Sequence, residues 1–298
     1  MHRTRTQNCF KGHLLSNIML SVTNLATALY CKRKLFIEKV LRLKKIPKES
    51  LAKGKVRHAA YELVNKEDES IVRTIRKKTE FPELLLFYKK KHLQCLQNAL
   101  LQHKGELKEV NLALPDVFKQ SWPSLYRETK ERAFHVFSFM EKHQVYGEEL
   151  WQLLTPKIDS EVKIVSEELL LTGIIDQVWH YEDETIPYEL KTGSAPLKGV
   201  WPSHSIQIGS YILMLQNIQE NAKKGYVKYL DIQESREVFL NPFLEDKILA
   251  TRDAVVTMIE TRELPDRTSN KKKCDSCEFK AQCYDEKVMD AEMKKLQN

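Results

Sequence analysis

The chain has 298 residues, of which 42% are hydrophobic and 30% are charged, a composition typical of a globular protein with a sizeable core. No apolar run approaches the ~20 residues needed to span a bilayer, which excludes a helical membrane protein, and we expect no membrane partner. The basic N-terminus lacks the apolar core of a secretion signal, so we expect an intracellular protein.

Basic residues are concentrated at the N-terminal end. Residues 1–57 contain fourteen Lys or Arg and two acidic residues, a net charge of +12, whereas the whole chain carries +7. Such asymmetry favours a polyanionic partner, nucleic acid before membrane. A solvated basic helix face would give the same charge count, so both interpretations stay open on charge alone.

Helical patterns dominate the first half of the chain. Residues 1–18 are expected to be a flexible basic tail. Residues 19–65 are expected to hold N-terminal helices, one starting at the N-cap residue Ser21 and running past Cys31, and one over 51–64 with His58 beside its apolar stripe. A lone Cys or His in such a helix is more often structural than functional. Residues 66–155 are expected to form a helical insertion.

Strand patterns begin after Pro156. Residues 157–165 and 169–179 are expected to form a hairpin whose second strand carries Asp176. A third strand, ending near residue 193, carries Glu189 and Lys191, which point to the same face because side chains alternate along a strand. Two carboxylates and an amine that converge on one sheet face indicate metal-assisted hydrolysis.

The pattern after this sheet alternates again between helix and strand. A helix is expected over residues 204–220, where Gln207 and Tyr211 are four apart and so share a face. Two strands and a helix to residue 263 follow, and the core of the domain is expected to span residues 156–265. The predicted fold class is α/β (α+β), with a central mixed sheet flanked by helices and a large helical insertion.

The C-terminal segment, residues 266–298, contains Cys274-x-x-Cys277 and then Cys283. Clustered cysteines in an intracellular chain favour a metal site over disulfides. A tetrahedral site needs a fourth ligand, for which Cys31 is the candidate. A zinc site and an iron–sulfur cluster fit the spacing equally well. Either group would join the N- and C-terminal segments.

Together these residues resemble the RecB-like branch of the PD-(D/E)XK nucleases that carry an iron–sulfur cluster, which includes the CRISPR-associated RecB-like exonucleases and exonuclease V. The ordered set of motifs is Cys31, Gly54-x-x-x-His58, Gly173-x-x-Asp176, Glu189-x-Lys191, Gln207-x-x-x-Tyr211, Cys274, Cys277 and Cys283. Each motif alone is weak, but the set spans most of residues 20–285. The interval that holds residues 66–155 is longer than in compact CRISPR-associated members. The proline–aspartate of the family name is not literally present, although Pro187 lies two residues before Glu189.

The resemblance implies a restriction-endonuclease-like fold and a metal-dependent DNA exonuclease that prefers single strands. Mg²⁺ or Mn²⁺ would be held by His58, Asp176, Glu189 and the backbone carbonyl of Leu190, with imidazole favouring Mn²⁺. Lys191 would orient the attacking water or offset charge on the phosphate.

The remaining motif residues are given supporting roles by the same resemblance. Gln207 and Tyr211 would support the lysine or contact the DNA backbone. The four-cysteine site would hold a structural 4Fe-4S cluster rather than zinc.

The partners follow from the same comparison of motifs. No G-x-x-x-x-G-K-[ST] motif occurs, so a separate helicase would be needed to open duplex DNA. CRISPR integrase proteins are the expected partners if the chain acts in spacer acquisition, and DNA repair is the other pathway. Two alternatives stay open: a non-catalytic DNA-binding or assembly subunit, and a four-cysteine zinc protein with a chance Glu-x-Lys.

Overall fold

The computed structural model describes residues 18–296 of the chain. The flexible tail expected over residues 1–18 therefore lies, apart from Ile18, outside the described residues.

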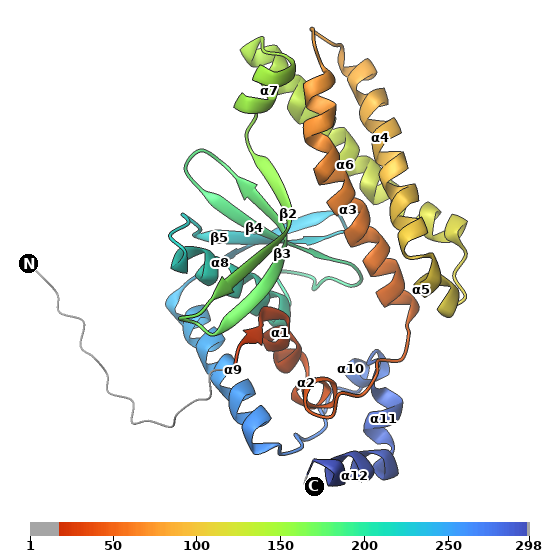
Figure 1. Cartoon of the computed structure of the whole chain (residues 1–298), viewed down its shortest axis with the longest axis vertical. Helices are drawn as coiled ribbons and strands as arrows, with labels where there is room; N and C mark the ends of the chain where they lie inside the picture. The colour runs from red at the N-terminus through yellow and green to blue at the C-terminus, as the bar shows by residue number, and fades with distance from the viewer. Residues whose placement is uncertain (1–17, 297–298) are drawn as a thin grey trace, which may run out of the picture.

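A single mixed sheet forms the centre of the described chain (Figure 1). Its strands are β1 (Leu20–Ser21), β2 (Lys157–Ser166), β3 (Leu171–His180), β4 (Thr185–Lys191), β5 (Lys224–Tyr229) and β6 (Glu234–Phe239). The order is β1-β3-β4-β5-β6, and β2 pairs with β3 along its other edge. The β1–β3 and β4–β5 pairs are parallel and the other pairs are antiparallel. The predicted mixed sheet flanked by helices is confirmed.

One face of the sheet is covered by three helices that belong to the main core. These helices are α1 (Val22–Tyr30), α8 (Pro202–Asn217) and α9 (Pro242–Thr261). Leu25 of α1, Ile212 of α8 and Val256 of α9 are buried in one cluster with Val227 of β5. Burying large aliphatic side chains contributes roughly 1.5–3 kcal/mol each, and this layer therefore fixes α8 against the strands.

The predicted helical insertion forms a tall layer beside the sheet (Figure 1). It consists of α3 (Glu49–Thr74), α4 (Phe81–Gln102), α5 (Lys104–Glu109), α6 (Leu114–His143) and α7 (Gly147–Leu153). Val56 of α3 and Leu96 of α4 are buried in a cluster that includes Leu190 of β4. This packing holds α3 against the strand that carries the Glu-x-Lys motif. Helix α3 is continuous through residues 65 and 66, where the insertion was expected to begin.

The last three helices of the described chain lie beside α2 (Lys32–Lys39) at the foot of the molecule in Figure 1. They are α10 (Lys271–Asp275), α11 (Lys280–Tyr284) and α12 (Glu286–Lys295). Lys34 Nζ and a carboxylate oxygen of the buried Glu278 lie 2.9 Å apart. Two segments that are far apart in sequence thus meet through a partly buried ion pair.

The first predicted helix is wrong in one respect, because it is interrupted at Cys31. This residue has an extended backbone (φ −164°) and separates α1 from α2. The break is satisfied locally: the Cys31 N–H donates to the carbonyl of Thr27, and the Cys31 sulfur accepts from the backbone N–H of Lys34. The Cys31 thiol therefore caps the N-terminus of α2.

None of the helices within residues 18–296 is long and apolar enough to cross a membrane.

Candidate active site

The candidate site lies where β3 and β4 separate. Their antiparallel ladder ends at the pair Gln177 and Tyr188, and beyond it β4 pairs in parallel with β5. Continued pairing would set Asp176 opposite Glu189. Instead, the Asp176 side chain provides the acceptor: its Oδ2 lies 2.7 Å from the donating backbone N–H of Leu190. The Asp176 carboxylate is therefore fixed at the point where β3 and β4 separate, which we call the fork.

Glu189 and Lys191 lie on the same side of β4, as their spacing predicted. Lys191 Nζ donates to Glu189 Oε1 at 2.8 Å and to Gln207 Oε1 of α8 at 2.9 Å. The helix that covers the sheet thus holds the lysine from the other side. The structure brings Asp176, Glu189, Lys191 and Gln207 together, as the sequence analysis predicted.

His58 reaches this fork from α3. Its Nδ1 lies 3.3 Å from Asp176 Oδ1. One helical turn earlier on the same face is Gly54, where a Cβ would lie 3.2 Å from the Thr192 side-chain oxygen. Glycine at that position lets α3 approach the end of β4 closely. The Gly54-x-x-x-His58 spacing therefore has a structural reason. Gly54 lets α3 lie close to the end of β4, and His58 on the same face contacts Asp176.

Tyr211 is completely buried on α8, one turn beyond Gln207. Its hydroxyl donates to the backbone carbonyl of Ile174 on β3 at 2.8 Å. A residue with no exposed surface is not placed to contact DNA. Tyr211 instead fixes the strand segment that leads to Asp176.

The charges of the site are strongly perturbed. Burial and the nearby Asp176 raise the pKa of Glu189 to about 7. Burial lowers the pKa of His58, but the charge of Asp176 outweighs it and the net pKa is raised. Burial likewise lowers the pKa of Lys191, and the charge of Glu189 raises it more. These opposing effects are typical of carboxylates gathered around a cation site.

The donor atoms present fit a divalent cation. Glu189 is only 4% exposed, yet its Oε2 has no hydrogen-bond partner among the described residues. A buried carboxylate oxygen without a partner is costly unless a cation compensates for it. Carboxylate oxygens are the ligands that Mg²⁺ and Mn²⁺ prefer, and His58 adds an imidazole nitrogen. The structure shows the Leu190 N–H bound to Asp176, while the ligand role expected for the Leu190 carbonyl stays a prediction.

The sequence analysis missed one acidic residue, Glu161 on β2. Within the described chain, one group of three His, Cys, Asp or Glu side chains has its donor atoms within 4.8 Å of one another: His58, Glu161 and Asp176. The predicted hairpin contained the signal that could have identified Glu161. Its register pairs Ser160 with Gln177 and Val162 with Ile175, which sets Glu161 opposite Asp176.

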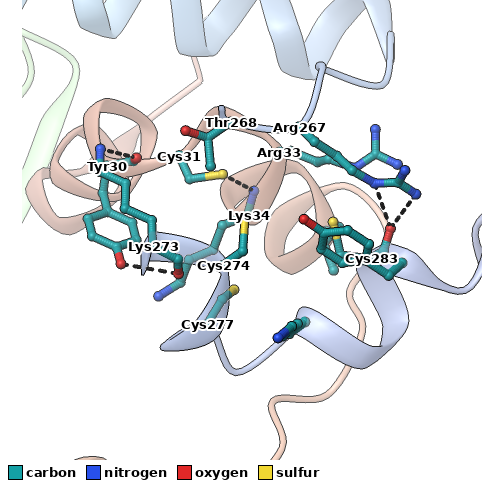
Figure 2. Close-up of a pocket in the computed structure, with 13 residues that line it drawn as sticks. Tyr30, Cys31, Arg33, Lys34, Arg267, Thr268, Lys273, Cys274, Cys277 and Cys283 are labelled. Atoms are coloured by element: carbon teal, nitrogen blue, oxygen red, sulfur yellow. Dashed lines mark hydrogen bonds between the residues drawn. The ribbon is translucent and has the colours of Figure 1, made fainter. Parts of the chain in front are cut away.

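A second cluster of functional groups lies at the foot of the molecule. Figure 2 shows Cys31, Cys274, Cys277 and Cys283 around one pocket. The first comes from the junction of α1 and α2, and the others come from the segment of α10 and α11. Positive side chains line the same pocket: Arg33, Lys34, Arg267, Lys273 and Lys280. The four cysteines therefore line one pocket, while the metal or cluster expected there stays a prediction.

The basic N-terminal segment is less free than its charge count indicated. Arg3, Arg5 and Lys11 fall outside the described residues. Five others form ion pairs with acids, at Lys34, Lys45, Lys53, Lys55 and Arg57. Ion pairs within the chain therefore compensate for part of the charge of this segment.

Comparison with known proteins identifies the superfamily of this chain. The sequence model of the PD-(D/E)XK nuclease superfamily matches residues 19–284, a range that includes every residue of the fork and all four pocket cysteines. The chain belongs to this superfamily. Asp176 lies on β3, and Glu189 and Lys191 lie on β4, while their assignment to the motif of this superfamily stays a prediction.

Two curated relatives of this PD-(D/E)XK protein are CRISPR-associated exonuclease Cas4/endonuclease Cas1 fusions. The fusion from Leptospira interrogans serogroup Icterohaemorrhagiae serovar Lai (strain 56601) is 26% identical over 152 residues, which cover 48% of this chain and 28% of the relative. The fusion from Myxococcus xanthus (strain DK1622) is 28% identical over 131 residues, 42% of this chain and 23% of the relative. The match thus spans about a quarter of the length of these relatives.

One solved structure that this chain resembles is described as "Crystal structure of SSO0001". It is 13% identical, covers 75% of this chain and 96% of its own, and superposes with a TM-score of 0.32.

Proposed function

We propose that this chain is a divalent-metal-dependent deoxyribonuclease that hydrolyses phosphodiester bonds and acts as an exonuclease on single-stranded DNA. The observation that supports it best is the fork itself: the buried Glu189 Oε2 has no hydrogen-bond partner among the described residues, Lys191 Nζ donates to Glu189 Oε1, and His58 Nδ1 lies 3.3 Å from Asp176 Oδ1. Membership of the PD-(D/E)XK nuclease superfamily supports the same reaction class.

Each residue of the fork has its own role in the proposed hydrolysis. A bound Mg²⁺ or Mn²⁺ would polarise the scissile phosphate and lower the pKa of a coordinated water. Asp176, Glu189 and His58 supply its protein ligands, and the Leu190 N–H fixes the orientation of the Asp176 carboxylate. Lys191, held between Glu189 and Gln207, offsets the negative charge that develops on the phosphate. Tyr211 acts by position only.

The test is cleavage of end-labelled single-stranded DNA with Mg²⁺ or Mn²⁺. We expect Lys191→Met and Asp176→Asn to lower the rate by on the order of 100-fold or more, because each removes stabilisation of the transition state. Lys163→Met is the matched control, since Lys163 is an exposed lysine on β2. Absence of cleavage by the unaltered protein, or cleavage by the Lys191 variant at the control rate, contradicts the proposal.

The four-cysteine pocket is proposed to hold a structural 4Fe-4S cluster. Four thiolates are anionic, and the lysines and arginines that line the pocket compensate for that charge. Backbone N–H groups donate to sulfur at Cys31 and at Cys277, each at 3.4 Å, as expected around an iron–sulfur cluster.

Iron and sulfide analysis of protein purified without oxygen distinguishes the two groups. We expect about four irons and four sulfides per chain from the proposed cluster stoichiometry. Cys277→Ser should lose them, and Cys95→Ser, which alters a buried thiol of α4, should retain them. A colourless protein that contains zinc and keeps its fold contradicts the cluster.

The curated relatives favour one biological setting. In both of them, a CRISPR-associated exonuclease is fused to an endonuclease, Cas1. We propose that this chain works beside a CRISPR integrase of the same cell, in the selection or trimming of DNA for spacer acquisition. Co-purification with the integrase encoded in the same genome tests the partnership. If that genome contains no CRISPR genes, the same nuclease activity is expected to act in DNA repair.

A further inference from the structure

Glu161 has a position that the motifs of the family do not assign. It is on β2, opposite Asp176 of β3, between the register pairs Ser160–Gln177 and Val162–Ile175. Side chains that face each other across an antiparallel ladder project to the same face of the sheet. The strand that carries no family motif therefore delivers a third carboxylate to the fork.

The Glu161 carboxylate is close to the donor atoms of His58 and Asp176, all three lying within 4.8 Å of one another. It forms no hydrogen bond or salt bridge with any residue between 18 and 296. Its backbone has φ 52°, a left-handed conformation that is uncommon for residues other than glycine. The local backbone thus holds a glutamate where no described donor satisfies it.

The fork as a whole carries more negative than positive charge. Glu161, Asp176 and Glu189 face Lys191 and His58, and Lys191 already donates to Glu189 Oε1 and to Gln207. The buried Oε2 of Glu189 has no hydrogen-bond partner within residues 18–296, which independently indicates a cation-binding site. A cation that binds near Asp176 would neutralise both Glu189 and Glu161.

We propose that Glu161 is a direct ligand of the divalent cation, together with His58 and Asp176. This inference deepens the proposed function and rests on it, since it concerns the cation of the same site. One imidazole nitrogen and carboxylate oxygens suit Mn²⁺ better than Mg²⁺, which prefers an all-oxygen shell. Glu161 thereby raises the affinity of the site and extends its ligands from two strands to three.

The experiment is a titration of the full-length protein with Mn²⁺, followed by the loss of the electron-paramagnetic-resonance signal of free Mn²⁺. We expect Glu161→Gln to weaken binding by about tenfold or more, because a neutral amide replaces a charged ligand. Glu161→Gly is the second variant: glycine suits the positive φ, so it removes the carboxylate without straining the backbone. Both should also reduce the rise in Tm that Mn²⁺ gives the unaltered protein.

Glu62→Gln is the matched control. Glu62 lies on α3, near enough for its charge to contribute to the raised pKa of Glu161, but it is paired with Lys66. A ligand role predicts little change in this variant, whereas a purely electrostatic role predicts losses at both positions.

The outcomes are separable because Mn²⁺ binding is read without DNA. Weaker binding in both Glu161 variants, with Glu62→Gln unchanged, supports the ligand. Unchanged binding in the Glu161 variants overturns it, and so does equal weakening in Glu62→Gln. If Asp176→Asn abolishes binding while the Glu161 variants bind normally, the ligand role is overturned and the proposed nuclease stands. Absence of DNA cleavage despite normal Mn²⁺ binding contradicts only the proposed function.

Discussion

The ring of Tyr211 lies directly on Gly173, so that a Cβ at residue 173 would sit 2.6 Å from the ring carbon Cε1. The tyrosine hydroxyl continues past the glycine to the carbonyl of Ile174. Two motifs that are far apart in sequence, Gly-x-x-Asp and Gln-x-x-x-Tyr, therefore pack against each other. The bare glycine admits the ring, and the ring fixes the strand two residues before Asp176.

Gly173→Ala should destabilise the fold, because the new methyl group overlaps the ring. We expect the free energy of unfolding to fall by about 1–3 kcal/mol, as for other overpacked positions. In a Tyr211→Leu background the same change should cost less, since the overlapping atoms are gone. Urea unfolding of the four proteins measures the coupling. Equal costs in both backgrounds would contradict the contact.

Asp176→Asn should stabilise the metal-free protein while it removes metal binding. Repulsion among Asp176, Glu189 and Glu161 opposes folding, and an amide oxygen still accepts the Leu190 N–H. We expect a gain of about 1 kcal/mol in a chelating buffer, relief of like charges being of that order. Thermal unfolding with and without Mn²⁺ tests both halves. A variant that is less stable than the parent without metal would be inconsistent, and Asp159→Asn, an exposed aspartate on β2, is the control.

Asp231 joins the loop after Lys191 to helix α3. Its carboxylate accepts from the backbone N–H of Gly193 and pairs with Arg57, the neighbour of His58. Asp231→Ala should cost about 1–2 kcal/mol, because it removes two charge-assisted contacts. It should also reduce DNA cleavage, since both the lysine and the histidine lose support. Urea unfolding and a cleavage assay check this, with unaltered activity as the contrary result.

His92 should make the helical layer sensitive to acid. It is fully buried on α4, with Nδ1 2.9 Å from the Thr129 hydroxyl oxygen. Burial, followed by the charge of Arg132, lowers its pKa to about 3, although Glu128 opposes the shift. Between pH 6.5 and 3 the unfolded state binds a proton that the folded state does not, so stability falls as the pH falls through this window.

The lowered pKa of His92 sets the size of the expected change in the free energy of unfolding. From pH 7 to pH 5 this group alone should cost about 2 kcal/mol of unfolding free energy, because a single-proton difference changes stability by at most ~1.4 kcal/mol per pH unit. His92→Gln retains a side chain that can bind Thr129 but does not titrate. Its stability should therefore change less between these pH values than that of the parent. An identical pH dependence in the two proteins would argue against the buried neutral histidine.

The sequence predicted the fork well because its residues follow simple periodicities. Glu189 and Lys191 share a face through the alternation of a strand, and Gln207 and Tyr211 share one through the turn of a helix. The grouping of the four cysteines was expected from the spacing of Cys274, Cys277 and Cys283 and from the need of a tetrahedral site for a fourth ligand. The contact of His58 with Asp176 required the motif, since nothing local distinguishes His58 from a structural histidine.

Other features depend on tertiary contacts that a single sequence does not display. Glu161 belongs to an ordinary alternating strand, and only its register with Asp176 reveals it. The break at Cys31 lies in a run with good helix propensity, where packing against the C-terminal segment prevails over local preference. Tyr211 was assigned a choice of roles, and only its burial excludes the contact with DNA.

The pairing of α2 with the segment that contains Glu278 has a consequence for how the protein is made. A ribosome releases the chain from its N-terminal end, so α2 emerges some 240 residues before the acid that binds Lys34. The four-cysteine pocket also lacks three of its cysteines until residue 274 has emerged, and its set is complete only at residue 283. Completion of this part of the fold therefore waits until residue 283 has emerged, and a chain that is terminated before this residue cannot assemble it.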